Sequence, residues 1–252
     1  MRWVLWLFWV VLAATHVSAQ PADNAQPTAL LRIAVASNFA PTLKALTKTY
    51  TRETGVPVSI SSASTGMLYN QIRYGAPFDL LLAADAVRPA RLVEEQLAEP
   101  DSRLTYALGR LVLAYSPALQ SQAAQGLEHL LTTPELTLAV ANPELAPYGV
   151  AGVEVLKRFQ GVKQRRLLAV NVAQAMQMLV AGGADLALVA KAQQPDHALD
   201  IPPDWYSPIV QQAVLLRAAS QPALARDFLH WLTGDKARAT IEQYGYRLPD
   251  RA

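Results

Sequence analysis

The sequence has 252 residues, of which 52% are hydrophobic and 17% charged, a composition that excludes a disordered chain. Its 22 Lys and Arg residues against 20 Asp and Glu leave a net charge of +2, and the basic residues are scattered. A nucleic-acid partner would favour a concentrated basic stripe, so we expect none. Cysteine is absent, which excludes disulfides, thiolate nucleophiles and cysteine-ligated metal sites.

Residues 1–19 are typical of a secretory signal peptide, because a short basic start is followed by an apolar run at 3–14 and by small residues before Gln20. A membrane anchor is the alternative, but the run has only about 12 residues, whereas a spanning helix needs about 20. No cysteine follows the run, which excludes a lipid anchor. We therefore expect cleavage before Gln20, a loose leader at 20–29 and a mature chain in an extracytoplasmic compartment.

Short hydrophobic runs alternate with helical patterns from Leu30 onward, which predicts an α/β fold with mainly parallel sheets. The runs are almost continuously hydrophobic, as is usual for strands that helices cover on both faces. In chain order we expect strands at 31–36, 56–61, 80–84, 111–115, 136–141, 167–170, 186–190 and 209–216. The Pro-rich, polar stretch 195–208 breaks the alternation and predicts a surface loop.

Small or polar residues closely follow four of the predicted strands and precede predicted helices. These positions are Ser37 with Asn38, the Ser/Thr cluster 61–66, Tyr148 with Gly149, and Asn171. A helix N-terminus offers unpaired N–H groups and the positive end of the helix dipole, so several that converge could hold an oxyanion without Lys or Arg. Each residue taken alone is also an ordinary helix cap. Because ligands of open α/β sheets bind outside the carboxyl ends of the strands, the pattern indicates a polar cleft of oxyanion size.

Five segments resemble the periplasmic molybdate-binding proteins of ABC transporters: VASNF (35–39), ISSASTG (60–66), GAPFDLLLAAD (75–85), NPELAPYG (142–149) and NVAQAM (171–176). The resemblance covers nearly the whole mature chain. It implies a two-lobed periplasmic binding protein fold with mainly parallel sheets and a hinge, in which lobe 1 comprises 30–113 plus 214–252 and lobe 2 comprises 114–213. It further implies a periplasmic monomer that needs no cofactor, captures molybdate or tungstate between its lobes and delivers it to the membrane permease of an ABC transporter.

The resemblance also implies which residues hold the ligand. Ser37 and Asn38 match the family's first binding turn, and Thr65 stands where many relatives carry a Ser with the same hydroxyl donor. Tyr148 and Val172 match two positions of the second lobe that act chiefly through backbone N–H groups. Truncating the Tyr148 side chain is therefore expected to be mild. These five residues would hold the metal of molybdate through its oxygens.

One position departs from the family pattern. Some relatives carry a Tyr near the end of the 186–190 strand that hydrogen-bonds the oxyanion, whereas this sequence has Ala190. The sequence therefore resembles the subgroup that uses the Ser/Asn turn and the Tyr148 amide instead.

Enzymes are the competing class of function. The sequence has no G-x-S-x-G, no H-E-x-x-H, no P-loop and no G-x-G-x-x-G after a strand, so we expect no catalytic activity. The four histidines are far apart, and Asp79 and Asp85, which could share a sheet face, are expected in turn and cap roles. The alternatives left open are a binding protein for sulfate, phosphate or a small organic anion, and an enzyme on the same fold.

Overall fold

The computed structural model describes residues 29–159, 161 and 163–250. The signal peptide expected at 1–19 lies outside these residues, as does the leader expected at 20–29 except for residue 29. Within the described ranges, no helix is both long and apolar enough to cross a membrane.

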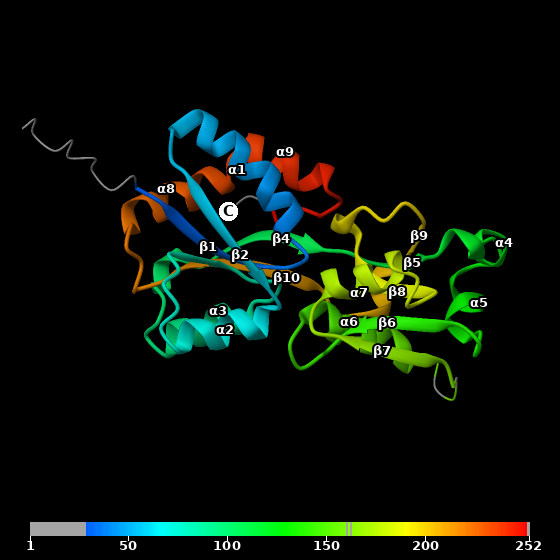
Figure 1. Cartoon of the computed structure of the whole chain (residues 1–252). Helices are drawn as coiled ribbons and strands as arrows, with labels where there is room; N and C mark the ends of the chain where they lie inside the picture. Colours follow the sequence, from blue (N-terminus) through cyan, green and yellow to red (C-terminus); the bar gives the residue numbers. More distant parts are fainter. Residues whose placement is uncertain (1–28, 160, 162, 251–252) are drawn as a thin grey trace, which may run out of the picture.

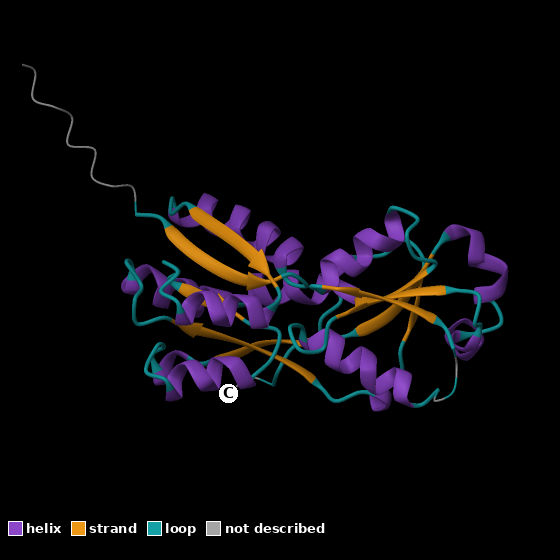
Figure 2. Ribbon diagram, turned by 60° about the horizontal axis from the view of Figure 1, so that its bottom comes forward, coloured by secondary structure: helices purple, strands orange, loops and turns teal. Residues whose placement is uncertain are grey.

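Two five-stranded sheets form the two lobes of an elongated molecule (Figures 1 and 2). The first sheet has the order β2-β1-β3-β10-β4, made of β2 (Val58–Ala63), β1 (Leu31–Ala36), β3 (Leu80–Leu82), β10 (Ile209–Leu215) and β4 (Leu104–Gly109). The second has the order β7-β6-β8-β5-β9, made of β7 (Arg165–Ala169), β6 (Thr137–Ala141), β8 (Leu186–Ala190), β5 (Leu111–Tyr115) and β9 (Ala198–Asp200). In the first sheet β10 is antiparallel to the other four strands, and in the second sheet β5 is antiparallel to the other four. The predicted two-lobed α/β fold is confirmed.

Helices cover both faces of the first sheet. Alternate residues of β1 point to opposite faces, so Ile33 and Val35 pack in one core cluster and Ala34 in another. The Ile33 side is covered by α1 (Ala40–Thr54), α8 (Pro222–Leu232) and α9 (Asp235–Gln243), and the Ala34 side by α2 (Thr65–Arg73) and α3 (Val87–Glu94). The second lobe holds α4 (Gln120–Ala123), α5 (Leu127–Thr132), α6 (Pro147–Lys157) and α7 (Val172–Val180).

Helix α1 illustrates how local sequence places a turn at the end of a strand. The chain leaves β1 at Ala36, turns through Ser37 and Asn38, and enters α1 with a Pro in its first turn. The helix ends at Thr54 and is capped by Gly55, whose φ of 74° is the left-handed conformation that glycine adopts without strain. The two turn residues are thereby fixed at the carboxyl end of β1.

The chain crosses between the two sheets twice. Arg110 separates β4 from β5, and residues 201–208 separate β9 from β10. The lobe boundaries expected at 113/114 and 213/214 therefore fall inside β5 and β10. Each strand pairs only with strands of its own sheet, so the chain passes from one lobe to the other between strands and not within them.

Strand bounds agree with the sequence analysis for part of the chain. The strands predicted at 31–36, 111–115 and 186–190 are β1, β5 and β8 with the same bounds, whereas β4 and β9 were not predicted. Strand β9 lies within the stretch expected to be a surface loop, and that prediction is wrong for its three residues. They pair with β5, which turns a short polar segment into an edge strand.

Candidate functional site

All five residues expected to hold the ligand line one small cavity between the lobes. Ser37 and Asn38 follow β1, Thr65 follows β2, and Tyr148 and Val172 open helices α6 and α7 of the second lobe. Ala36, Ser64, Ala84, Ala146 and Pro147 complete the lining of this cavity. Each of the five expected residues is at most 6% exposed. The turns meet because β1 is parallel to β2 and β6 is parallel to β7, so their carboxyl ends face the same gap.

The lining of this cavity is neutral. Among the described residues that form it, none is a Lys, Arg, Asp or Glu. The described ranges also hold no group of three or more His, Asp or Glu side chains that could bind a metal ion directly. Such a cavity suits a ligand that accepts hydrogen bonds, because hydroxyl and backbone N–H groups are its polar donors.

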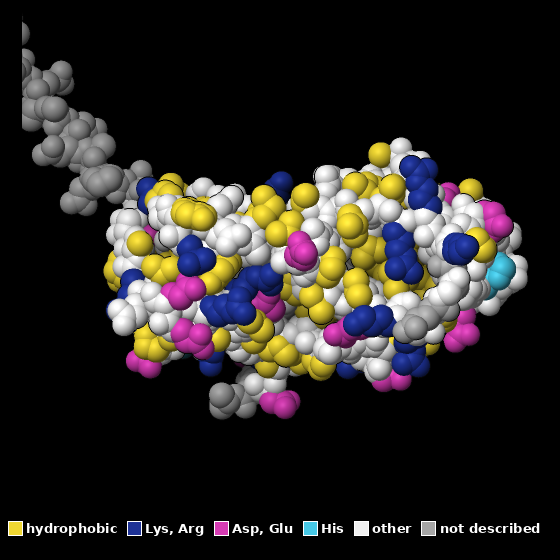
Figure 3. Space-filling model, turned by 90° about the horizontal axis from the view of Figure 1, so that it is seen from below, with side chains coloured by type: hydrophobic (Ala, Val, Ile, Leu, Met, Phe, Trp, Pro, Cys, Tyr) yellow, Lys and Arg dark blue, Asp and Glu magenta, His cyan; other side chains and the backbone are white. Residues whose placement is uncertain are grey.

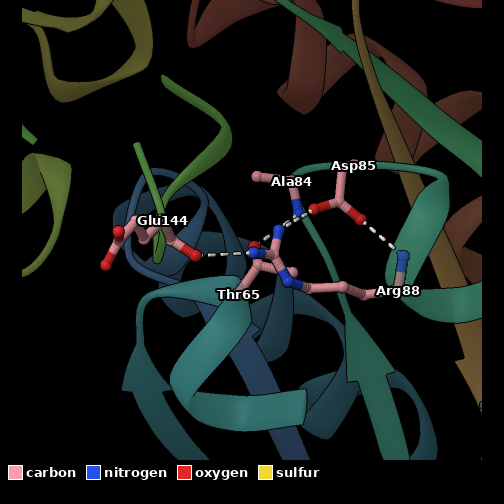
Figure 4. Close-up of polar contacts among 5 residues, drawn as sticks. All are labelled: Thr65, Ala84, Asp85, Arg88 and Glu144. Carbon is pink, nitrogen blue, oxygen red and sulfur yellow. Dashed lines mark hydrogen bonds and ion pairs between the residues drawn. The ribbon is translucent and has the colours of Figure 1, made fainter. Parts of the chain in front are cut away.

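Thr65 has a hydroxyl whose orientation is fixed by a backbone contact. Its Oγ1 accepts a hydrogen bond from the backbone N–H of Ala84 at 3.1 Å (Figure 4). A hydroxyl has one hydrogen and two acceptor lone pairs, so accepting this bond leaves the hydrogen available for a ligand. The contact therefore makes Thr65 a donor toward the cavity.

The Asn38 side chain is engaged on the protein side. Its Nδ2 donates to Gln211 Oε1 at 2.9 Å and to the Tyr246 hydroxyl at 3.0 Å, which uses both amide hydrogens. The Tyr246 hydroxyl in turn donates to the Asn38 carbonyl at 2.9 Å. The donor that Asn38 can offer a ligand is therefore its backbone N–H.

The Tyr148 side chain reaches from the cavity to strands β4 and β10 of the first sheet. Gln211, which is fully buried in β10, donates from Nε2 to the Tyr148 hydroxyl at 3.2 Å. A Cβ at Gly109 would lie 2.4 Å from that hydroxyl, so only glycine at this position leaves room for it. Burial raises the pKa of the Tyr148 hydroxyl well above its ordinary value, so the group stays protonated at neutral pH. The expectation that truncating this side chain is mild concerns ligand binding and stays a prediction. Folding stability is a separate quantity, because the ring is buried in the core of the second lobe.

Val172 contributes to the cavity in a simpler way. It is the first residue of α7, and the preceding Asn171 caps the helix by accepting from the Gln174 N–H at 3.0 Å. N–H groups of the first helical turn have no partner inside the helix, which leaves the Val172 N–H, like that of Tyr148 in α6, available to a ligand. Ala190 by contrast is fully buried in β8, where it pairs with Leu111.

Ser64 is a lining residue that the sequence analysis did not single out. It is the N-cap of α2 and is 2% exposed, but its side chain makes no capping hydrogen bond. Its Oγ is buried without a hydrogen-bond partner among the described residues. A buried hydroxyl that lacks a partner costs about 1 to 3 kcal/mol, so this group is suited to a ligand that would supply the partner. The Ser/Thr cluster at 61–66 predicted the turn but not which of its hydroxyls lacks a partner.

Direct hydrogen bonds join the two lobes at the rim of the cavity. The Gly66 N–H of α2 donates to the Leu145 carbonyl at 2.9 Å, and Arg88 Nη2 of α3 donates to the Glu144 carbonyl at 3.1 Å (Figure 4). Both carbonyls belong to the turn that precedes α6 in the second lobe. We use the term closed conformation for this arrangement, in which the two lobes are hydrogen-bonded to each other.

The two aspartates considered as a carboxylate pair have structural partners instead. Asp79 is 1% exposed and accepts from the backbone N–H groups of Arg32 at 2.7 Å and Ser220 at 2.7 Å. Asp85 accepts from the backbone N–H of Arg88 at 2.9 Å, at the start of α3. The turn and cap roles predicted for them are confirmed.

Comparisons with known proteins identify the family of this chain. Residues 31–247 match the model of the family described as bacterial extracellular solute-binding protein. The chain is 35% identical over 221 residues to the molybdate-binding protein ModA of Rhodobacter capsulatus, covering 84% of this chain and 86% of the relative. It is 36% identical over 240 residues to ModA of Azotobacter vinelandii, covering 89% and 92%. The solved structure of the Azotobacter vinelandii periplasmic molybdate-binding protein superposes with a TM-score of 0.79 at 37% identity, covering 87% of this chain and all of that one.

Proposed function

Because the chain belongs to the family of bacterial extracellular solute-binding proteins, we propose that it captures molybdate between its two lobes and delivers it to an ABC importer. Its relatives at 35% and 36% identity are molybdate-binding proteins, and the similarity covers most of their length. The observation that supports this function best is the neutral cavity to which both lobes contribute. A tetrahedral dianion can accept hydrogen bonds on every side, and this lining offers donors from both lobes.

In the proposed complex the first lobe donates through the Ser37 and Thr65 hydroxyls and the Asn38 backbone N–H. The second lobe donates through the backbone N–H groups of Tyr148 and Val172. Both of these lie in the first turn of a helix, so the positive ends of two helix dipoles add to the attraction for an anion. We also assign the unpartnered Ser64 hydroxyl as a sixth donor, since molybdate would supply the acceptor that it lacks.

The same donor set leads us to propose a ligand preference. Molybdate and tungstate are fully deprotonated dianions, which accept from every donor. Monohydrogen phosphate carries a proton that would need an acceptor, and a buried polar group without a partner costs about 1 to 3 kcal/mol. Sulfate carries no proton but has shorter bonds, so in a cavity closed to fit molybdate some donors would be out of its reach. We therefore propose that the protein binds molybdate and tungstate, prefers them to sulfate and rejects phosphate.

The remaining parts of the proposal concern location and partners. We propose that residues 1–19 are cleaved on export and that the mature chain works in the periplasm as a monomer, without a cofactor and without catalytic activity. Its protein partner would be the membrane permease of a molybdate ABC transporter. On the face seen in Figure 3, Lys and Arg side chains occur on both lobes and are interspersed with Asp and Glu.

A ligand-screened thermal melt of the mature protein tests this function. Ligand at about 100 times its dissociation constant stabilises the folded state by roughly 2.7 kcal/mol, which for this size of protein raises Tm by about 5 to 11 °C. We expect this shift with molybdate and tungstate and none with chloride at matched ionic strength. A flat response to both oxyanions would contradict the proposal, as would displacement of molybdate by comparable concentrations of sulfate or phosphate in competition calorimetry.

A further inference from the structure

The contact between Arg88 and Glu144 crosses the cleft without being part of the ligand cavity. Arg88 lies in the first turn of α3, which belongs to the first lobe, and Glu144 lies in the turn before α6 in the second. The Arg88 guanidinium lines an outer groove at the junction of the lobes and is not among the residues that line the oxyanion cavity. Its 3.1 Å hydrogen bond to the Glu144 carbonyl therefore joins the lobes directly.

Asp85 fixes the direction of the Arg88 side chain. The Asp85 carboxylate accepts from the Arg88 backbone N–H at 2.9 Å through one oxygen and from Arg88 Nη1 through the other (Figure 4). Because both residues belong to the first lobe, this arrangement orients Nη2 toward the second lobe without any contribution from the ligand. It also neutralises the guanidinium charge locally, which weakens any direct attraction of Arg88 for an anion.

The turn that accepts this bond is held by hydrogen bonds of its own. Asn142 Oδ1 accepts from the Glu144 N–H at 3.0 Å, and the Asn142 carbonyl accepts from the N–H groups of Leu145 and Ala146 at 3.1 and 2.9 Å. The neighbouring Leu145 carbonyl accepts from the Gly66 N–H across the cleft, so the first lobe donates to two consecutive carbonyls, those of Glu144 and Leu145. This turn leads directly to Tyr148, so holding it also holds a proposed ligand donor in place.

We propose that Arg88 is a clamp that sets the lifetime of the closed conformation, and with it the rate at which bound molybdate is released. Arg88 is a positioning residue in this scheme, since it acts on the lobes and not on the ligand. The release rate rests on the proposed molybdate function, whereas the effect on closure does not. An alternative role, electrostatic attraction of the incoming anion, would change association and would depend strongly on salt.

The test compares the mature wild-type protein with Arg88→Ala, Arg88→Lys and Arg91→Ala. Arg88→Lys keeps the charge but loses the planar fork that contacts Asp85 and Glu144 together. Arg91 lies on the same helix and lines the same outer groove, so Arg91→Ala is the matched control. Release is measured by chasing radiolabelled molybdate with excess unlabelled molybdate, and association by rapid mixing at two salt concentrations.

We expect Arg88→Ala to release molybdate about 5- to 10-fold faster, since the lost bond has a charged donor but is exposed, with association changed by less than about 2-fold. Arg88→Lys should also release faster, and Arg91→Ala should match the wild type. An unchanged release rate in Arg88→Ala, or a salt-dependent loss confined to association, would overturn the clamp.

Small-angle scattering of the ligand-free proteins keeps this test separate from the identity of the ligand. If Arg88 stabilises closure, ligand-free Arg88→Ala has a larger radius of gyration than ligand-free wild type, whatever the protein binds. Identical dimensions for the two would count against the clamp. Failure of the wild type to bind molybdate would instead contradict the proposed function.

Discussion

The two lobes line the same cavity with different chemistry. The first lobe contributes hydroxyl side chains at the carboxyl ends of β1 and β2 together with the backbone N–H of Asn38, whose side chain is bound to Gln211 and Tyr246. The second lobe contributes Tyr148 and Val172 in the first turns of α6 and α7, where the free groups are backbone N–H. A side-chain donor is lost with one substitution, whereas a backbone donor persists for as long as the helix begins at the same place.

The second lobe is not uniform in this respect. Val172 has a small side chain and is the first residue of α7, which Asn171 caps. Tyr148 has a large ring whose hydroxyl accepts a hydrogen bond from Gln211 of β10 and lies against Gly109 of β4. Two residues with the same proposed backbone role should therefore respond very differently to truncation.

Tyr148→Ala should have the largest effect. Removing a fully buried aromatic ring costs about 3 to 5 kcal/mol of folding stability and leaves Gln211 Nε2 without its acceptor. We expect Tm to fall by about 6 to 20 °C, measured by differential scanning calorimetry. Tyr148→Phe keeps the ring and should lose about 1 to 3 kcal/mol. Equal, small losses in both variants would contradict the proposed packing role.

Thr65→Val should be next, and its main effect should be on binding. The substitution removes a hydroxyl that donates to a charged ligand, which costs about 1.5 to 3 kcal/mol, or roughly 10- to 100-fold in affinity for molybdate. It also leaves the Ala84 N–H unpaired, so a modest loss of stability should accompany it. Thr65→Ser keeps both hydrogen bonds and should bind as the wild type does in titration calorimetry. Weak binding by the Ser variant would argue against the hydroxyl as the donor.

Ser64→Ala separates a ligand role from a structural one by the sign of its effects. Because the Ser64 hydroxyl has no partner in the described structure, its removal should leave the Tm of the ligand-free protein unchanged or slightly higher. Affinity for molybdate should nevertheless fall by about 10-fold. A lower Tm with unchanged affinity would assign Ser64 to the fold of α2 and not to the ligand.

Val172→Ala should be the mildest of these substitutions. The proposed backbone donor is retained and the Asn171 cap is unchanged, so affinity for molybdate should stay within about 3-fold of the wild type. Removing two buried methyl groups should lower stability by roughly 1 to 2 kcal/mol. A loss of affinity as large as that of Thr65→Val would contradict the difference between the lobes.

The pH dependence should be absent from binding and confined to stability at high pH. No group that titrates near neutral pH lines the cavity among the described residues, so molybdate affinity should be constant between about pH 6 and 9. Burial raises the pKa of Tyr106, Tyr148 and Tyr246 above the ordinary value of about 10. The unfolded chain therefore loses these protons first, and stability should be full below about pH 10 and decline above it. Urea unfolding across this range measures the decline, and Tyr148→Phe should reduce it.

The fold could be predicted from the sequence to the extent that hydrophobic runs were long and buried. β1, β5 and β8 carry almost only apolar residues and were predicted with their observed bounds. β4 and β9 are edge strands with partly exposed residues, and they form because a neighbouring strand offers its hydrogen-bonding edge. That edge is a property of the assembled sheet, which a short local pattern does not contain.

For the site as well, local sequence patterns predicted one part, and the rest depends on tertiary contacts. The strand–turn–helix pattern located the turns that carry Ser37, Asn38, Thr65, Tyr148 and Val172, and these turns meet because the carboxyl ends of parallel strands face one gap. Their role as donors to an oxyanion stays a prediction. Two of these residues have partners that are remote in the chain: Asn38 bonds Gln211 across 173 positions, and Tyr148 bonds Gln211 across 63.

The sequence by itself determined the α/β class, most of the strands and the family resemblance, because each of these is written in local patterns of hydrophobic and polar residues. Only the tertiary structure decided which donors are free, which are committed to the protein and where the lobes touch. Ser64 lacks a partner while the Asn38 amide has two, and no spacing of residues distinguishes them. The physical reason is that a hydrogen bond needs its two groups within about 3.5 Å, and that proximity is created by the packing of segments far apart in the chain.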